Sequence, residues 1–124
     1  MIAADSSSLI AYIQGEKGAD ITLLDAALAA GQAVLPPVVL TEVLSDPLIP
    51  NPHEVLLDSL RILEIGDGYW RRAAKLRAIL KSQNLRATMA DALIAQSCID
   101  HNVVLITRDS DFRHFAKHCG LKLA

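Results

Sequence analysis

The sequence predicts one α/β domain spanning residues 1–124, with a three-layer α/β/α arrangement around a central parallel sheet of four to five strands. Its 124 residues are the usual length of one domain. Of these residues 52% are apolar, which is enough to build a hydrophobic core. Short apolar runs alternate with longer helical segments, and this alternation is typical of a parallel sheet with helices on both faces.

Four short apolar runs are the predicted strands. Each run ends at a polar residue, a glycine or a proline, and these residues commonly bound strands. The fourth run is the clearest, because β-branched residues dominate it. In chain order the predicted strands cover residues 1–4, 33–35, 62–65 and 103–107, and residues 121–123 form a short fifth strand.

The segments between the strands carry helix start and stop signals. Serines suit the start of the first helix, Gly31 ends the second, and Pro37 suits the first turn of the third. Three prolines make residues 46–52 a loop. The predicted helices cover residues 6–14, 20–30, 37–45, 52–60, 68–82, 90–100 and 111–118.

Charge and hydropathy limit what the protein can be. The formal net charge is −2, whereas a protein that coats phosphates is usually basic, so any nucleic-acid contact needs a local basic patch. The mean hydropathy of +0.30 is high for so short a chain. It predicts either apolar surface kept for a second copy of the chain, hence a homodimer, or a tightly packed core. The two interpretations carry equal weight at this point.

The cysteines and the N-terminus predict a cytoplasmic protein. Cys98 and Cys119 are too few and too far apart for a disulfide framework or a zinc site, so we expect reduced, packed thiols. The first apolar stretch has no basic leader and is interrupted at Asp5, which does not fit a signal peptide. No run is long enough to cross a bilayer.

Two acidic residues directly follow predicted strands. Asp5 comes after the first strand and Asp109 after the fourth. The carboxyl ends of parallel strands meet at one edge of a sheet, where ligands commonly bind, so we expect both side chains at the same edge. The alternative for each is an ordinary helix cap, because Asp is a favoured residue at helix starts.

Asp91 lies on a face of its predicted helix that should be buried. It shares that face with Ile94, Ala95 and Cys98, while Gln96 lies on the opposite, polar side. The dipole of the first helical turn favours an anion by only about 0.3–1 kcal/mol, and a buried unpaired carboxylate costs several. Asp91 therefore needs a cation. The alternative is an inward salt bridge to Arg86 or Arg108.

Glu42 completes a set of four candidate carboxylates. It lies on a polar arc of the helix after the second strand, and taken alone it fits a solvated helix face equally well. One acidic pocket explains all four residues together. Carboxylates held close to one another cannot all stay ionised without a counter-ion. Mg²⁺ or Mn²⁺ supplies such a charge and prefers oxygen ligands.

The same residues carry a resemblance to a known family. Its pieces are IAADSS at residues 2–7, VLTEVL at 39–44, ADALIA at 90–95 and VLITRDSDF at 104–112. The ordered set of acidic residues resembles a PIN domain, in particular the small VapC-type toxins of bacterial and archaeal toxin–antitoxin pairs. The resemblance covers almost the whole chain.

This resemblance implies a PIN-like fold and a metal-dependent endoribonuclease that cleaves single-stranded RNA. It implies Asp5, Asp91 and Asp109 as ligands of Mg²⁺ or Mn²⁺, with Glu42 binding a second ion or orienting the attacking water. Asp111 would assist Asp109. The implied partners are the RNA substrate, a cognate antitoxin protein and a second copy of the chain. We further expect Thr107 and Ser7 to hydrogen-bond the carboxylates and so fix their orientation.

A basic helix is the candidate RNA-binding surface. The alternative is that its basic residues form an ordinary solvated helix face, and the sequence favours neither interpretation over the other. Tyr69 and Trp70 at its start can stack on a base, although packing in the core or a dimer is the more common role of such residues. The candidate basic residues are Arg71, Arg72, Lys75, Arg77, Lys81 and Arg86.

Several other functions compete with this interpretation. His114 and His118 share a helical face, but no third ligand in a known motif accompanies them. A phosphoacceptor signalling domain would need a strand-end lysine late in the chain, and none follows Asp67. A non-catalytic binding module on the same fold and a nuclease of RNA processing outside toxin–antitoxin systems both remain open.

Overall fold

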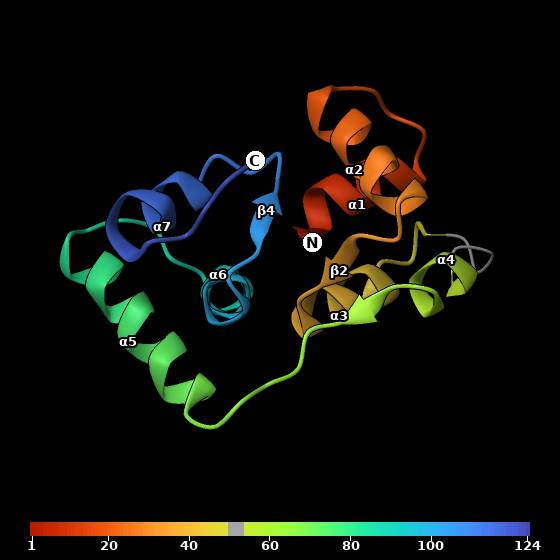
Figure 1. Cartoon of the computed structure of the whole chain (residues 1–124). Coiled ribbons are helices and arrows are strands. Elements are labelled where there is room, and N and C mark those ends of the chain that lie inside the picture. The colour runs from red at the N-terminus through yellow and green to blue at the C-terminus, as the bar shows by residue number, and fades with distance from the viewer. Residues whose placement is uncertain (50–53) are drawn as a thin grey trace.

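The computed structural model describes residues 1–49 and 54–124, and it has the predicted α/β architecture (Figure 1). All strand pairs are parallel, and the strand order is β3-β2-β1-β4. The strands are β1 (Ile2–Ala4), β2 (Ala33–Leu35), β3 (Arg61–Ile62) and β4 (Val104–Ile106). The central position of β1, between β2 and β4, brings the first strand of the chain beside the last.

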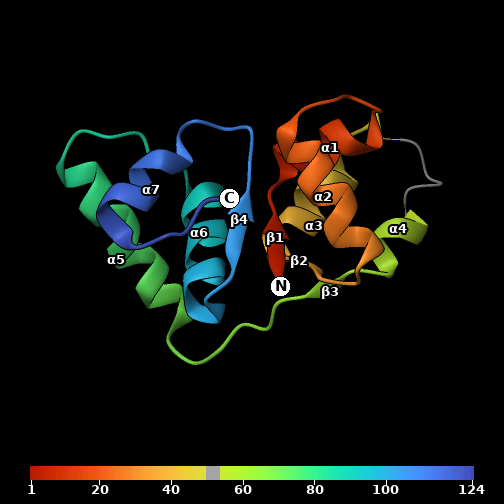
Figure 2. The ribbon, with the colours of Figure 1, turned by 45° about the horizontal axis from the view of Figure 1, so that its top comes forward.

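The helices divide between the two faces of the sheet. Crossovers between parallel strands are right-handed, so the steps from β1 through β2 to β3 place their helices on one face, and the return from β3 to β4 places its helices on the other. Figure 2 shows α1 to α4 on one side of the β1–β4 pair and α5 to α7 on the other. The helices are α1 (Ser6–Ile13), α2 (Ala19–Ala29), α3 (Pro37–Ser45), α4 (Glu54–Asp58), α5 (Tyr69–Ser82), α6 (Met89–His101) and α7 (Phe112–Cys119).

Burial of consecutive strand residues confirms the three-layer prediction. Successive side chains of a strand point to opposite faces of the sheet. Ala3 and Ala4 are 0% and 1% exposed, and Leu105 and Ile106 are equally buried. Both faces of the sheet are therefore covered. No helix in the two described ranges has the length and apolar character that a membrane crossing requires.

The third strand is shorter than predicted. The apolar pattern predicts residues 62–65, but β3 contains only Arg61 and Ile62, which pair with Val34 and Leu35. One further bond joins the Leu63 amide to the Leu35 carbonyl at 2.9 Å. Pro36 and Pro37 follow Leu35 and end β2. The next donor in this register would be residue 37, a proline without an amide hydrogen, so residues beyond Leu63 find no strand to pair with.

The other boundaries need smaller corrections. The predicted fifth strand at residues 121–123 is a single parallel bridge between Leu105 and Leu123. The predicted helix at residues 52–60 is α4 over Glu54–Asp58, and its first two positions lie outside the described residues, as does part of the loop at 46–52. The thiols of Cys98 and Cys119 are free, with Cys98 fully buried.

Helix α6 is more enclosed than its sequence pattern indicates. Gln96, predicted on a polar side, is only 5% exposed and donates a hydrogen bond from its amide to Asp100 at 2.8 Å. The reason is that α6 packs against α3, α5 and α7. The contact between α3 and α6 also brings the helix of Glu42 to the helix of Asp91.

Truncating Leu105 to alanine should lower the free energy of unfolding by about 2–5 kcal/mol, because the side chain is fully buried in the hydrophobic core. Leu23→Ala is the matched control, since Leu23 is 46% exposed on α2 and its loss should cost about 0.5 kcal/mol or less. Urea unfolding in EDTA at one protein concentration measures both. Equal effects of the two substitutions would contradict the position of β4 in the core.

Candidate metal centre

Asp5 lies at the junction of β1 and α1, where it is held by three hydrogen-bond donors. Its Oδ1 accepts from the Ser8 amide at 3.0 Å and from the Ser7 hydroxyl at 2.8 Å. Its Oδ2 accepts from the Thr107 hydroxyl at 2.5 Å. Asp5 is therefore the N-cap of α1, as the capping alternative predicted. A carboxylate has about four acceptor positions, so these three hydrogen bonds leave one position available.

Burial dominates the electrostatics of Asp5, whose side chain is almost inaccessible to water. Desolvation raises the pKa of its carboxyl, hydrogen bonds from Thr107, Ser8 and Ser7 oppose that rise, and the charge of Asp109 adds to it. Asp5 and Asp109 are thus close enough to repel one another. This is the proximity expected from the parallel pairing of β1 and β4.

Asp109 lies in the loop between β4 and α7. Its amide donates to the Thr107 hydroxyl oxygen at 2.9 Å, and its Oδ1 accepts from the Asp111 amide at 2.9 Å. Helix α7 begins only at Phe112 with Asp111 in the N-cap position, so the alternative that Asp109 caps this helix is wrong. The Asp109 carboxylate instead accepts from the amide two residues later and closes an Asx turn, which is common for aspartate in loops.

Asp91 occupies the first turn of α6. Thr88 caps the helix, and its hydroxyl accepts from the Asp91 amide at 3.2 Å. Burial, together with the charges of Asp109, Asp5 and Glu42, raises the pKa of Asp91 to about 6, while Thr88 opposes the shift. The four carboxylates selected from the sequence therefore act on one another electrostatically.

The structural salt-bridge alternative for Asp91 is absent from the described parts of the chain. Arg86 lies 3.7 Å from Asp111 instead. Arg108 pairs with Asp20 at 2.6 Å and with Glu16 at 3.0 Å. Within residues 1–49 and 54–124, Asp91 thus has no cationic side chain within ion-pair distance, although it is half-buried.

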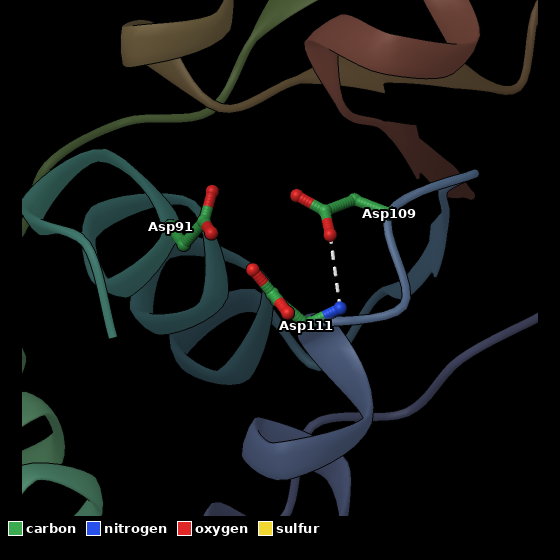
Figure 3. Close-up of side chains that lie close together, drawn as sticks. All are labelled: Asp91, Asp109 and Asp111. Atoms are coloured by element: carbon green, nitrogen blue, oxygen red, sulfur yellow. Dashed lines mark hydrogen bonds between the residues drawn. The ribbon is translucent and has the colours of Figure 1, made fainter. Parts of the chain in front are cut away.

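Three carboxylates come together most closely. Asp91, Asp109 and Asp111 each offer one oxygen, and these oxygens lie within 4.8 Å of one another. Figure 3 shows Asp91 on α6 facing Asp109 and Asp111 at the start of α7. An all-carboxylate donor set fits hard divalent cations such as Mg²⁺ and Mn²⁺. The donor chemistry therefore fits the expected metals.

This closest group differs in membership from the ligand set expected from the sequence. Asp111, expected only as a helper, is one of its three members, and Asp5 is not. The spacing of Asp109 and Asp111 in the sequence could have indicated that both carboxylates reach the site. The turn that brings them to Asp91 depends on tertiary structure, however, and the sequence does not predict it. Glu42 lies at the exposed edge of the site, where its Oε1 accepts from the Ser6 hydroxyl at 2.6 Å.

The candidate RNA-binding residues separate into two groups. Three of them already have protein partners: Arg72 binds Asp100 at 2.6 Å, Arg77 donates to the Ala87 carbonyl at 2.8 Å, and Arg86 approaches Asp111. The remaining three are exposed along α5, and they are Arg71, Lys75 and Lys81.

The two aromatic residues at the start of α5 also differ. Tyr69 is buried, and its hydroxyl donates to the Leu93 carbonyl at 2.6 Å, so it belongs to the core. Trp70 is 61% exposed. It lines an apolar groove of about 340 Å³ between α5 and α6, together with Lys81, Met89 and Leu93.

The histidine alternative gains no support from the geometry. His114 and His118 both lie on α7. In the described residues, the cluster of potential metal ligands contains only the three aspartates and neither histidine.

Replacing Asp91 by Asn should stabilise the metal-free protein at pH 7 by an amount on the order of 1 kcal/mol. The pKa of Asp91 is raised from 3.8 to about 6. Its contribution to stability is therefore present below about pH 4 and is lost as the pH rises through about 6. Thermal melts in EDTA should show the gain at pH 7 and little of it at pH 4.

Asp100→Asn is the matched control for Asp91→Asn, with the opposite expected sign. The partner Arg72 lowers the pKa of Asp100, so removing that charge should destabilise the protein at pH 7. A loss of about 3–5 kcal/mol for Asp91→Asn at pH 7 would instead reveal a buried ion pair and refute the cation-site assignment.

Comparisons with known proteins agree with the observed fold. A family model described as PIN domain matches residues 2–118. The solved structure of VapBC2 from Rickettsia felis, bound to a DNA fragment from their promoter, contains a similar chain with a TM-score of 0.77 and 20% identity over 100% of this chain and 98% of that chain. VapBC-1 from nontypeable Haemophilus influenzae gives a TM-score of 0.75 and 19% identity over 100% and 97%.

A toxin–antitoxin complex from Klebsiella pneumoniae is similar as well, with a TM-score of 0.71 and 21% identity over 98% of this chain and 95% of that chain. Among curated protein sequences, none matches. The TM-scores to the solved structures show a shared fold, and the family model extends over nearly the entire length. The chain therefore belongs to the PIN-domain family.

Proposed function

We propose that this protein is a metal-dependent endoribonuclease that cleaves single-stranded RNA, and that it is the toxin of a toxin–antitoxin pair. The observation that carries the proposal is the convergence of Asp91, Asp109 and Asp111 at the carboxyl edge of the sheet, without a cationic partner for Asp91 in the described residues. Family membership and the toxin–antitoxin complexes among its structural neighbours support the biological role.

The proposed ligands of Mg²⁺ or Mn²⁺ are Asp5, Asp91 and Asp109, with Asp111 added because of its proximity to the last two. When bound, the cation supplies positive charge at the scissile phosphate and lowers the pKa of a water molecule. The raised pKa of Asp91 means that this residue carries a proton part of the time near pH 6, which cation binding must displace.

Glu42 is the proposed catalytic carboxylate. It is exposed at the rim of the cluster, and the Ser6 hydroxyl orients it through a 2.6 Å hydrogen bond. In the proposed hydrolysis, the water oxygen bonds to phosphorus while the bond from phosphorus to the 3′ oxygen breaks. Glu42 orients the water and takes its proton, and the departing oxygen gains a proton from solvent. The products carry a 5′-phosphate and a 3′-hydroxyl.

The exposed cations of α5 form the proposed RNA track. Arg71, Lys75 and Lys81 present positive charge to solvent. Arg72, Arg77 and Arg86 contribute less in this proposal, because each is already bonded within the protein. The track is local, which suits a chain whose formal net charge is −2.

Purified protein should cleave single-stranded RNA in the presence of Mn²⁺ and stop when EDTA is added, because the cluster needs a cation to act. Glu42→Gln should lower kcat at least a hundredfold. Glu64→Gln is the control, since it removes an exposed carboxylate outside the cluster. Mapping the products by end chemistry should give 5′-phosphates.

Cleavage that persists in EDTA would refute the proposed mechanism. A metal-binding protein that cuts no RNA would instead favour a non-catalytic binding module. Cleavage of DNA but not RNA would overturn the substrate assignment.

The protein should form a homodimer, with a mass twice the 13.4 kDa of one chain. The exposed apolar side chains around the α5–α6 groove supply a reason, because Trp70 and Met89 are 61% and 63% exposed. Light scattering across a wide concentration range measures the mass. Trp70→Lys should shift the equilibrium toward monomer. Leu48→Lys should not, because Leu48 is also exposed but does not line the α5–α6 groove. A monomer mass throughout would refute the dimer.

A further inference from the structure

Arg108 stands between two residues that hold the acidic site, yet its own side chain points away from that site. Thr107 on one side bonds Asp5, and Asp109 on the other belongs to the closest carboxylate group. The Arg108 guanidinium instead reaches the α1–α2 turn and the first turn of α2. There it donates to Asp20 at 2.6 and 3.1 Å, to Glu16 at 3.0 Å and to the Lys17 carbonyl at 2.7 Å.

The acceptor side of this contact is also tied to the site. Asp20 accepts a third hydrogen bond, from the Ser8 hydroxyl at 3.0 Å, and the amide of the same Ser8 donates to Asp5. The Arg108 amide itself donates to the Ser7 hydroxyl oxygen at 3.1 Å. A closed ring of hydrogen bonds thus connects the start of α1, the α1–α2 turn and the loop of Asp109.

The α1–α2 turn is built to accept this contact. Gly18 has a φ of +154°, and a Cβ added there would lie 2.6 Å from Asp20 Oδ1 and 2.9 Å from Arg108 Nη2. A side chain at residue 18 would therefore push the Arg108–Asp20 pair apart. Gly15 in the same turn has a φ of +75° but nothing within 4 Å of an added Cβ. Of the two glycines in this turn, only Gly18 therefore lies close to the Arg108–Asp20 pair.

Charge explains why the loop needs an anchor. Asp5, Asp91 and Asp109 repel one another, and this repulsion tends to spread the elements that carry them. The Arg108 fork is satisfied by two carboxylates of the turn, so it is not available to neutralise the site or to bind a phosphate. A bidentate arginine–carboxylate pair fixes geometry as well as charge. Its remaining role is to hold position.

We propose that Arg108 is a positioning residue: through its pair with Asp20 it fixes the loop of Asp109 against the start of α1, and so sets the spacing of the carboxylates. The inference rests on the proposed function only for its effect on cation binding. The site should bind Mn²⁺ less tightly when the pair is removed, because partners that orient metal ligands typically contribute 10–100-fold in affinity.

Calorimetric titration with Mn²⁺ tests this effect at a temperature where every variant is folded. Arg108→Gln and Asp20→Asn should each weaken binding about tenfold or more. Arg72→Gln is the matched control, since it removes a bidentate pair of similar geometry with Asp100 from the α5–α6 side. It should change affinity by about twofold or less. Equal weakening by Arg108→Gln and Arg72→Gln would overturn the proposal.

Amide hydrogen exchange in EDTA tests the same role without any metal. In Arg108→Gln, the amides of residues 107–111 should exchange about tenfold faster than in the parent, while Arg72→Gln leaves them unchanged. Gly18→Ala should reproduce the effect with both charges present, and Gly15→Ala controls for strain at a positive φ. Unchanged exchange in Arg108→Gln would overturn the proposal. If the parent protein binds no Mn²⁺, the proposed function fails, and the exchange experiment still decides the role of Arg108.

Discussion

The structure depends above all on the parallel pairing of β1 with β4. Ile2, Ala3 and Ala4 pair with Val104, Leu105 and Ile106, and the Asp5 amide continues the ladder with a 3.1 Å bond to the Ile106 carbonyl. Residues about a hundred positions apart in the chain therefore leave the sheet side by side and in the same direction. The acidic site follows from this one register, because a shift by one residue would turn each side chain to the opposite face.

Bringing several carboxylates together has an energetic cost, and the local structure reduces part of it. Hydroxyl and amide donors from Ser7, Ser8 and Thr107 stabilise the charge of Asp5. Thr88 accepts from the Asp91 amide at the start of α6 and lowers the pKa of the Asp91 carboxyl. Asp91 keeps a raised pKa despite this help. Burial is the largest cause of that rise, and the charges of Asp109, Asp5 and Glu42 add to it, which is typical of functional sites.

Patterns within one segment predicted most of the fold, and contacts between segments account for what they missed. Helix and strand positions followed from apolar periodicity and from Pro37 and Gly31, all of which act locally. The length of β3 did not follow from such a pattern, because the two prolines that end the neighbouring strand limit it. The enclosure of Gln96 was missed for the same reason, since three other helices surround α6.

The candidate site shows the same division. The sequence brought Asp5, Asp91 and Asp109 toward one edge, because strand direction determines where strand ends lie. It did not predict that Asp111 joins Asp91 and Asp109, because that depends on the turn closed by Asp109. From the sequence alone, Arg108 was a possible partner of Asp91. Its guanidinium binds Asp20 instead, a contact between distant segments that no local sequence pattern predicts.

The hydroxyl of Thr107 has only one hydrogen, and this gives its two bonds a fixed polarity. An ionised Asp5 can only accept, so the hydrogen points to Asp5 and the oxygen lone pairs receive the Asp109 amide. A proton on the Asp5 oxygen that faces Thr107 would make that oxygen a donor and oblige the hydroxyl to turn. Since a hydroxyl oxygen has two lone pairs, it would still receive the Asp109 amide while its hydrogen turned toward the Ser7 hydroxyl oxygen, 3.5 Å away. The direction of the Thr107 hydroxyl is thus linked, through a single rotatable hydrogen, to the ionisation state of a carboxylate that follows another strand.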